Sequence, residues 1–171
     1  MDYCIQASTY HSKRIGELIW MLEHTREVTL SEIAHLSMEE LDLVAEKTIN
    51  SIAILLAHIA SIEFVHQVIS FEKRDLTNKE YEEWGPLLEI NTLAKETIRN
   101  KPVEYYAEKL RQIRERTLVH LKEKDDQWLF EESKWDNGVS YNNYYLWFHV
   151  MEDEISHRGQ IRLIKRMFEL G

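Results

Sequence analysis

The chain has 171 residues, of which 44% are hydrophobic and 30% are charged, and its formal net charge is −9. This length suits one folded domain, and the apolar fraction is large enough for a core. The acidic balance argues against nucleic acid as a partner, because phosphate contacts need a basic surface. Only 5 Gly and 2 Pro interrupt the chain. We therefore expect a single helical domain spanning residues 1–171, with charged outer faces.

Cysteine usage and hydropathy bear on the compartment. Cys4 is the single cysteine, so no intrachain disulfide can form and nothing requires an oxidising compartment. The first residues show no basic region followed by an apolar run, so no signal peptide is expected. The longest apolar segment, Ile52–Ile62, contains His58 and Ser61 and falls short of the roughly 20 apolar residues that cross a bilayer. These features predict a soluble, cytoplasmic protein.

Helical periodicity, with apolar residues at three- and four-residue steps, marks four long segments. They cover approximately residues 10–29, 50–71, 101–121 and 140–170. Asn50 or Ser51 is a suitable cap for the second segment, and Pro102 suits the first turn of the third. Ser140 is the expected cap of the fourth.

Two of the connections carry a capping-box pattern, in which a hydroxyl residue precedes a glutamate by three positions. Ser37 with Glu40 forms one such pattern, and Thr77 with Glu80 forms the other. Each predicts a short helix between the long ones. We expect the second short helix to end at Trp84-Gly85-Pro86.

The connection before the fourth long segment is aromatic. Residues 127–135 include two tryptophans and a phenylalanine, which is unusual for a disordered linker. They are expected to lie over the bundle as an extended pair that turns at Asp136-Asn137-Gly138. Four long helices with one or two long connections predict an all-α fold, a four-helix bundle with long crossover connections.

The fourth segment carries three side chains that bind metals. His149, Asp153 and His157 are spaced i, i+4 and i+8, and each step of four residues advances about 40° around a helix. All three therefore project to one side, which is also the apolar stripe. Glu152 and Glu154 flank that stripe and are expected to face water.

A fourth such group, His58, lies in an otherwise apolar run of the second segment. A buried carboxylate without a partner is costly, whereas a carboxylate and two imidazoles that converge on a cation satisfy one another. Three protein ligands also leave a position for water or substrate. The ordinary alternatives are a core histidine with a backbone partner and a simple His–Asp hydrogen bond. The other histidines are expected to be surface or structural residues: His11, His24, His35, His66 and His120.

Three short motifs occur in a fixed order along nearly the whole chain. They are Leu36-Ser37 with Glu40-Leu41-Asp42, then Asn50-Ser51-Ile52 with His58-Ile59-Ala60 and Glu63, then His149, Asp153 and His157-Arg158-Gly159-Gln160. In this combination the sequence resembles the DinB/YfiT-like superfamily, in particular its DUF664-type branch.

The resemblance implies an up-down-down-up four-helix bundle with a divalent transition metal, Zn²⁺ or Ni²⁺, between the second and fourth long helices. The implied ligands are His58, Asp153 and His157. Many members have Glu or His where this chain has the shorter Asp153. Spacing favours Asp153 over His149, because Asp153 lies about 6 Å from His157 along the helix axis and His149 about 12 Å. His149 is then either a fourth ligand or a neighbour of the site.

The resemblance also implies an enzyme with a small-molecule substrate. Members include transferases and isomerases in which the metal binds the sulfur of a low-molecular-weight thiol. Arg158 and Arg162 are expected to bind an anionic thiol cofactor. The protein is also expected to form a homodimer. Metal-activated water would use the same ligands for hydrolysis. Two further alternatives are a non-catalytic structural or stress-response metal-binding bundle and a metal-free dimerisation module.

Overall fold

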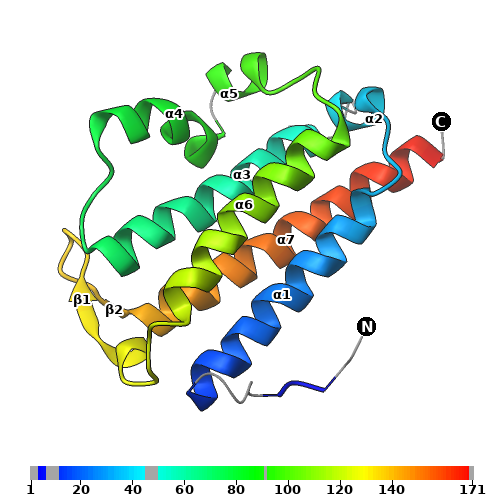
Figure 1. Cartoon of the computed structure of the whole chain (residues 1–171). Helices are drawn as coiled ribbons and strands as arrows, with labels where there is room; N and C mark the ends of the chain where they lie inside the picture. Colours follow the sequence, from blue (N-terminus) through cyan, green and yellow to red (C-terminus); the bar gives the residue numbers. More distant parts are fainter. Residues whose placement is uncertain (1–3, 7–11, 45–49, 91, 170–171) are drawn as a thin grey trace.

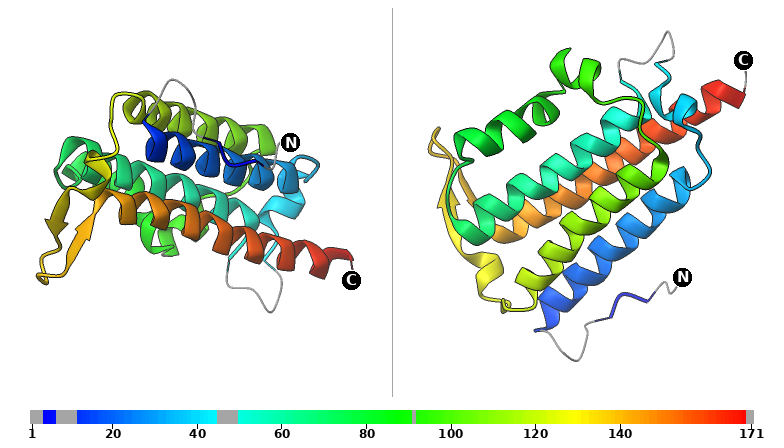
Figure 2. Two further views of the ribbon diagram at one scale, coloured as in Figure 1. Left: turned by 90° about the horizontal axis from the view of Figure 1, so that it is seen from below. Right: turned by 45° about the horizontal axis from the view of Figure 1, so that its top comes forward.

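The computed structural model describes residues 4–6, 12–44, 50–90 and 92–169. Four long helices lie side by side: α1 (Lys13–Ile33), α3 (Ile52–Gln67), α6 (Val103–Leu121) and α7 (Asn143–Glu169). Helices α1 and α7 run in one direction, and α3 and α6 run in the other (Figure 1). One layer holds α1 with α6 and the other holds α3 with α7 (Figure 2). The predicted all-α, up-down-down-up bundle is confirmed.

Shorter elements fill the connections. They are α2 (Met38–Asp42), the π-helical turn η1 (Val68–Glu72), α4 (Asn78–Glu89), α5 (Thr92–Thr97), the 3₁₀ turn η2 (Trp128–Phe130) and the antiparallel strands β1 (Glu132–Lys134) and β2 (Ser140–Asn142). Helix α4 packs on α3, opposite the α1–α6 layer, and the β-hairpin projects from one end of the bundle (Figure 2).

Both predicted capping boxes are present. The Ser37 hydroxyl accepts from the Glu40 amide, and the Glu40 carboxylate accepts from the Ser37 amide at 2.8 Å. Thr77 and Glu80 make the same reciprocal pair at the start of α4. These bonds satisfy amides that a helix start would otherwise leave without partners.

Helix α4 does not end at Trp84-Gly85-Pro86 as the sequence indicated. It continues through Pro86 to Glu89 and closes at Ile90, which is in the left-handed region with φ 48°. A proline this close to the end of a helix removes one amide hydrogen bond. Burial of Trp84 and Leu87, which are 6% and 7% exposed, offsets that loss.

The start of α7 also differs from the prediction. Ser140 lies in β2, and Asn142 caps the helix through its side-chain oxygen, which accepts from the Tyr145 amide at 2.8 Å. An extended pair that turns at Asp136-Asn137-Gly138 is present, with Gly138 at φ 81°. It projects from the end of the bundle instead of lying over it, and Trp128–Phe130 form the η2 turn. The proposed first helix start near residue 10 and last helix end near residue 170 lie outside the described residues.

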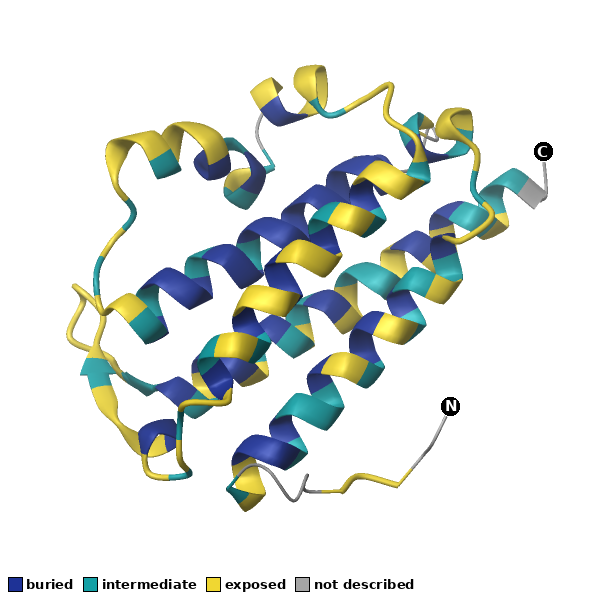
Figure 3. Cartoon of the chain, in the orientation of Figure 1, coloured by how far each residue is buried: buried dark blue, intermediate teal, exposed yellow. Residues whose placement is uncertain are grey.

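The apolar segment that contains helix α3 is longer than the Ile52–Ile62 stretch identified in the sequence. Together with η1 it forms a segment, Ile52–Glu72, that is long and apolar enough to cross a membrane by length and composition. However, 78% of its most apolar window is buried inside the protein, and Figure 3 shows α3 as an almost continuously buried helix. The segment therefore forms the core helix of the bundle.

The centre of the bundle is an ionic network with one residue from each long helix. Arg26 of α1, Glu63 of α3, Arg114 of α6 and Glu154 of α7 have side chains that are 0–5% exposed. Arg26 contacts Glu63 at 2.8 Å and Glu154 at 2.9 Å, and Arg114 contacts Glu63 at 2.7 Å. Two positive and two negative charges thus cancel in the interior.

The expectation that Glu154 faces water is wrong. Helix α7 packs against both α3 and α1, so it buries two faces rather than the single stripe that its apolar residues mark. Successive residues on a helix differ by about 100°, which places Asp153 and Glu154 on these two different faces. Glu154 is 0% exposed.

The two arginines determine the ionisation of the central carboxylate. Burial alone would raise the pKa of Glu63, but the charges of Arg114 and Arg26 lower it to about 2. The Thr117 hydroxyl adds a hydrogen bond to Glu63 at 2.6 Å. Glu63 is therefore ionised at neutral pH and fully partnered, as a buried charge must be.

Removing one charge from this network leaves the others uncompensated. We predict that Glu63→Gln lowers the free energy of unfolding by about 3–5 kcal/mol, the usual loss when one partner of a buried pair is removed. Glu23→Gln is the matched control, because Glu23 contacts Arg114 at 3.4 Å with its side chain 49% exposed. Its effect should stay below about 1 kcal/mol. Urea unfolding followed by circular dichroism measures both, and equal effects would contradict a central role for the network.

Candidate metal centre

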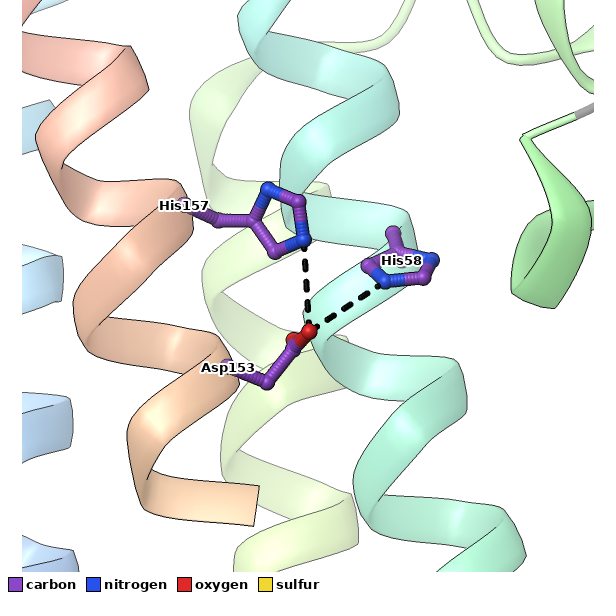
Figure 4. A group of neighbouring side chains, drawn as sticks. All are labelled: His58, Asp153 and His157. Carbon is purple, nitrogen blue, oxygen red and sulfur yellow. Dashed lines mark ion pairs between the residues drawn. The ribbon is translucent and has the colours of Figure 1, made fainter. Parts of the chain in front are cut away.

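Three side chains converge where α3 and α7 lie antiparallel. His58 extends from α3, and Asp153 and His157 extend from adjacent turns of α7 toward it (Figure 4). Each offers one ligand atom, and the three atoms lie within 4.8 Å of one another. His58 is 7% exposed, and the side chains of Asp153 and His157 are 13% and 14% exposed. The cluster is therefore largely shielded from water.

The separations within this triad suit a shared ion better than direct hydrogen bonds. Asp153 Oδ1 lies 3.5 Å from His58 Nε2 and 3.3 Å from His157 Nε2. Good hydrogen bonds between such groups are about 2.7–2.9 Å long. Two ligands on a tetrahedral ion with bonds of about 2.1 Å would be about 3.4 Å apart. The spacing thus matches that of ligands around one cation.

Helix α4 orients one of the imidazoles. Nδ1 of His58 lies 2.8 Å from the carbonyl oxygen of Leu87, an acceptor, so this nitrogen carries the hydrogen. Nε2 is then the nitrogen that faces Asp153. A backbone carbonyl on the far nitrogen is the usual device that fixes the tautomer and ring orientation of a metal-binding histidine.

The charge state of the triad also suits a cation. Burial alone would raise the pKa of Asp153, but the His157 and His58 imidazoles lower it well below its ordinary value. Burial lowers the pKa of His58, and the Asp153 carboxylate together with the Leu87 carbonyl more than offset this and raise it. An ionised carboxylate therefore faces two imidazoles, and a bound cation would replace a proton between them.

Two buried polar atoms of the triad have no hydrogen-bond partner among the described residues. They are Oδ2 of Asp153 and Nδ1 of His157, neither of which takes part in the Oδ1–Nε2 contacts of the triad. Buried polar atoms are nearly always satisfied, so such exceptions usually need a water, an ion or a ligand. The donor set, two imidazoles and a carboxylate, is one that Zn²⁺ and related ions accept.

The other predicted site residues lie apart from the triad. His149 has a side chain that is 38% exposed, and its Nδ1 lies 3.3 Å from the Glu152 carboxylate. Arg158 donates to the Thr25 carbonyl at 2.9 Å, and Arg162 donates to the carboxylate of Glu32 at 2.7 Å. Both arginines are thus bound to α1 rather than to the triad.

His66 is a buried residue whose surroundings the sequence reading missed. It is 7% exposed and its ring centroid lies 5.4 Å from that of His149. Its spacing of two turns from His58 was the available signal. Of the remaining histidines that we expected to be surface or structural, His11 lies outside the described residues.

Comparison with known families decides the relationship. The model of the mycothiol-S-transferase family matches residues 17–168. The chain belongs to this family. It is a DinB/YfiT-like family, so the resemblance drawn from the motifs is confirmed. No curated protein matches the sequence.

Solved structures share the fold at low sequence identity. A protein from Streptococcus pneumoniae superposes with a TM-score of 0.70 at 18% identity, covering 94% of this chain and 93% of that one. An uncharacterized protein from Clostridium difficile 630 gives 0.69 at 18%, covering 89% and 95%. The colibactin self-resistance protein ClbS, solved with double-stranded DNA, gives 0.62 at 12%, covering 89% and 95%. These likenesses show the fold alone.

We predict that Asp153 contributes more than His149 to the tightest metal-binding site. Asp153→Asn removes the charge that lies beside both imidazoles and should weaken Zn²⁺ binding at least about tenfold, because even the loss of a residue that only orients a metal ligand typically costs about 10–100-fold. His149→Gln should leave the tightest binding step within about threefold of wild type. Titration against a competing chelator measures both constants. A greater loss with His149→Gln would move the site one turn along α7.

Metal should also stabilise the fold. A cation held between α3 and α7 binds the native arrangement and not the unfolded chain. At a free concentration of 100 times the dissociation constant, the expected gain is about 2.7 kcal/mol. Thermal melts with Zn²⁺ and with a chelator should separate in the wild type and separate much less in His58→Gln. Coincident melts in wild-type protein that contains metal would place the ion at a peripheral site.

Proposed function

We propose that this protein is a metal-dependent thiol S-transferase that uses a low-molecular-weight thiol of the mycothiol type. The observation that carries the proposal is the shielded triad of His58, Asp153 and His157, in a chain that the mycothiol-S-transferase family model matches over residues 17–168. The ligand set offers three protein atoms, which leaves a fourth tetrahedral position for a sulfur.

His58, Asp153 and His157 would hold a divalent cation, which would lower the pKa of a thiol bound to it and so favour the thiolate at neutral pH. The chain supplies the rest. His58 is oriented by the Leu87 carbonyl, and Asp153 is kept ionised by its two imidazole neighbours. Their arrangement is held by the packing of α4, α3 and α7, so little reorganisation is needed when the ion and the thiol bind.

The reaction class follows from the nucleophile. The thiol proton passes to solvent, and the sulfur uses its electron pair to form a bond with an electrophilic carbon of the second substrate. The bond from that carbon to the leaving group breaks at the same centre, and the leaving group departs with that electron pair. Arg158 and Arg162 are proposed to bind an anionic part of the thiol, which would exchange for their present acceptors on α1.

Hydrolysis by metal-activated water would use the same three ligands and is the alternative that the experiment must separate. Thiol dependence distinguishes the two reactions, because a hydrolase needs only water. A non-catalytic metal-binding bundle would show neither reaction and no contact between an added thiol and the ion.

We predict that low-molecular-weight thiols bind directly to the ion. In Co²⁺-substituted protein, a thiol added at millimolar concentration should produce a sulfur-to-metal charge-transfer band in the near-ultraviolet. The alcohol analogue of the same thiol is the matched ligand control, and His58→Gln is the matched protein control; neither should give the band. Absence of the band with several thiols, in protein shown to contain Co²⁺, would favour hydrolysis or a structural role.

A further inference from the structure

The histidines of α3 and α7 form two pairs on either side of Asp153. On α3, His58 and His66 lie four residues before and four residues after Ile62. On α7, His157 and His149 lie four residues after and four residues before Asp153. Because the helices run antiparallel, His58 meets His157, with ring centroids 4.7 Å apart, and His66 meets His149 at 5.4 Å. The triad uses only the first of these pairs.

His66 has the environment of a ligand rather than that of a surface histidine. It is 7% exposed, and its Nδ1 lies 2.7 Å from the Ile62 carbonyl, so Nδ1 carries the hydrogen and Nε2 carries the lone pair. A backbone carbonyl thus holds the far nitrogen of His66, as the Leu87 carbonyl does for His58.

His149 supplies a second nitrogen from the outer side. Its ring is tilted 49° to that of His66, and its side chain is 38% exposed. The 3.3 Å separation between its Nδ1 and Glu152 is long for a charge-assisted hydrogen bond. The ring also stacks on Tyr145 with centroids 6.2 Å apart, so an ion beside His66 would draw it away from its contacts with Glu152 and Tyr145. His149 and Asp153 are also i, i+4 neighbours, the spacing at which two side chains of one helix share an ion.

The two carboxylate oxygens of Asp153 differ in their partners. Oδ1 lies beside Nε2 of both His58 and His157. Oδ2 is buried and has no hydrogen-bond partner among the described residues. A carboxylate with its two oxygens in different environments is suited to bridge two cations, which in two-metal sites lie about 3.5–4 Å apart.

We propose that His66, His149 and Asp153 Oδ2 form a second divalent-metal site, adjacent to the triad and bridged to it by the Asp153 carboxylate. Two imidazoles and a carboxylate select an ion of the Zn²⁺ or Co²⁺ class. Rotation of the exposed His149 ring closes the site around the ion. The inference shares Asp153 with the metal site of the proposed function but does not depend on thiol chemistry.

The test counts Co²⁺ ions bound by metal-free protein, by titration calorimetry and by elemental analysis after dialysis. Wild type should bind two equivalents, the second more weakly. His66→Gln and His149→Gln should each lose the second equivalent and keep the first, whereas His58→Gln removes the tighter one. His35→Gln is the matched control, because His35 is exposed in the turn after α1 and should leave both equivalents in place. Circular dichroism verifies that each variant is folded.

Two outcomes would overturn the second site. One is a single equivalent in the wild type at millimolar Co²⁺, which would leave the triad and the proposed function standing. The other is a second equivalent that persists in both His66→Gln and His149→Gln or disappears in His35→Gln, which would mark it as surface binding. Doubly loaded wild type should also show magnetic coupling between the two Co²⁺ ions in electron paramagnetic resonance, and uncoupled ions would contradict a shared carboxylate.

Discussion

The buried network of Arg26, Glu63, Arg114 and Glu154 is the constraint on which the rest of the structure depends. Each charge comes from a different long helix, so no two of these helices can shift against each other without leaving a charge unpartnered in the interior. Such networks contribute less to net stability than apolar packing of the same volume would, but they penalise alternative arrangements strongly. The network therefore specifies the relative rotation and register of α1, α3, α6 and α7.

The geometry of the candidate metal centre depends on this register of the helices. With Glu154 held between the arginines, the preceding residue, Asp153, is turned about 100° around α7 and faces α3. The antiparallel alignment of the two helices then places His58 beside His157, and α4 supplies the Leu87 carbonyl that orients His58. A site for a small cation tolerates little misplacement of its ligands, so a rigid core one residue away is a direct advantage for binding.

The same geometry concentrates polar groups along one seam of an apolar bundle. Helix α3 is almost entirely buried, yet it contributes two histidines to this seam and Glu63 to the core network. The carboxylate of Asp153 in this seam is stabilised by the imidazoles of His157 and His58 beside it. The protein thus keeps one concentrated polar site at the α3–α7 seam and a second, neutralised network at its centre, with apolar packing around both.

The sequence by itself determined the four long helices, both capping boxes, the hairpin turn and the shared face of Asp153 and His157, because periodicity and i, i+4 spacing are local properties. The grouping of His58 with these two residues came from the resemblance to the DinB/YfiT-like superfamily. The sequence misplaced the C-terminal end of α4 and the start of α7, where burial of Trp84 and Leu87 and a strand pairing outweighed local signals. The sequence also did not predict the core ionic network or the contact between His66 and His149. The sequence does not indicate whether a charged or imidazole side chain on a helix faces water or a partner on another helix. Only the tertiary structure decided these, because the packing of α7 against both α1 and α3 buries two of its faces, and the register of α3 against α7 decides which distant side chains touch.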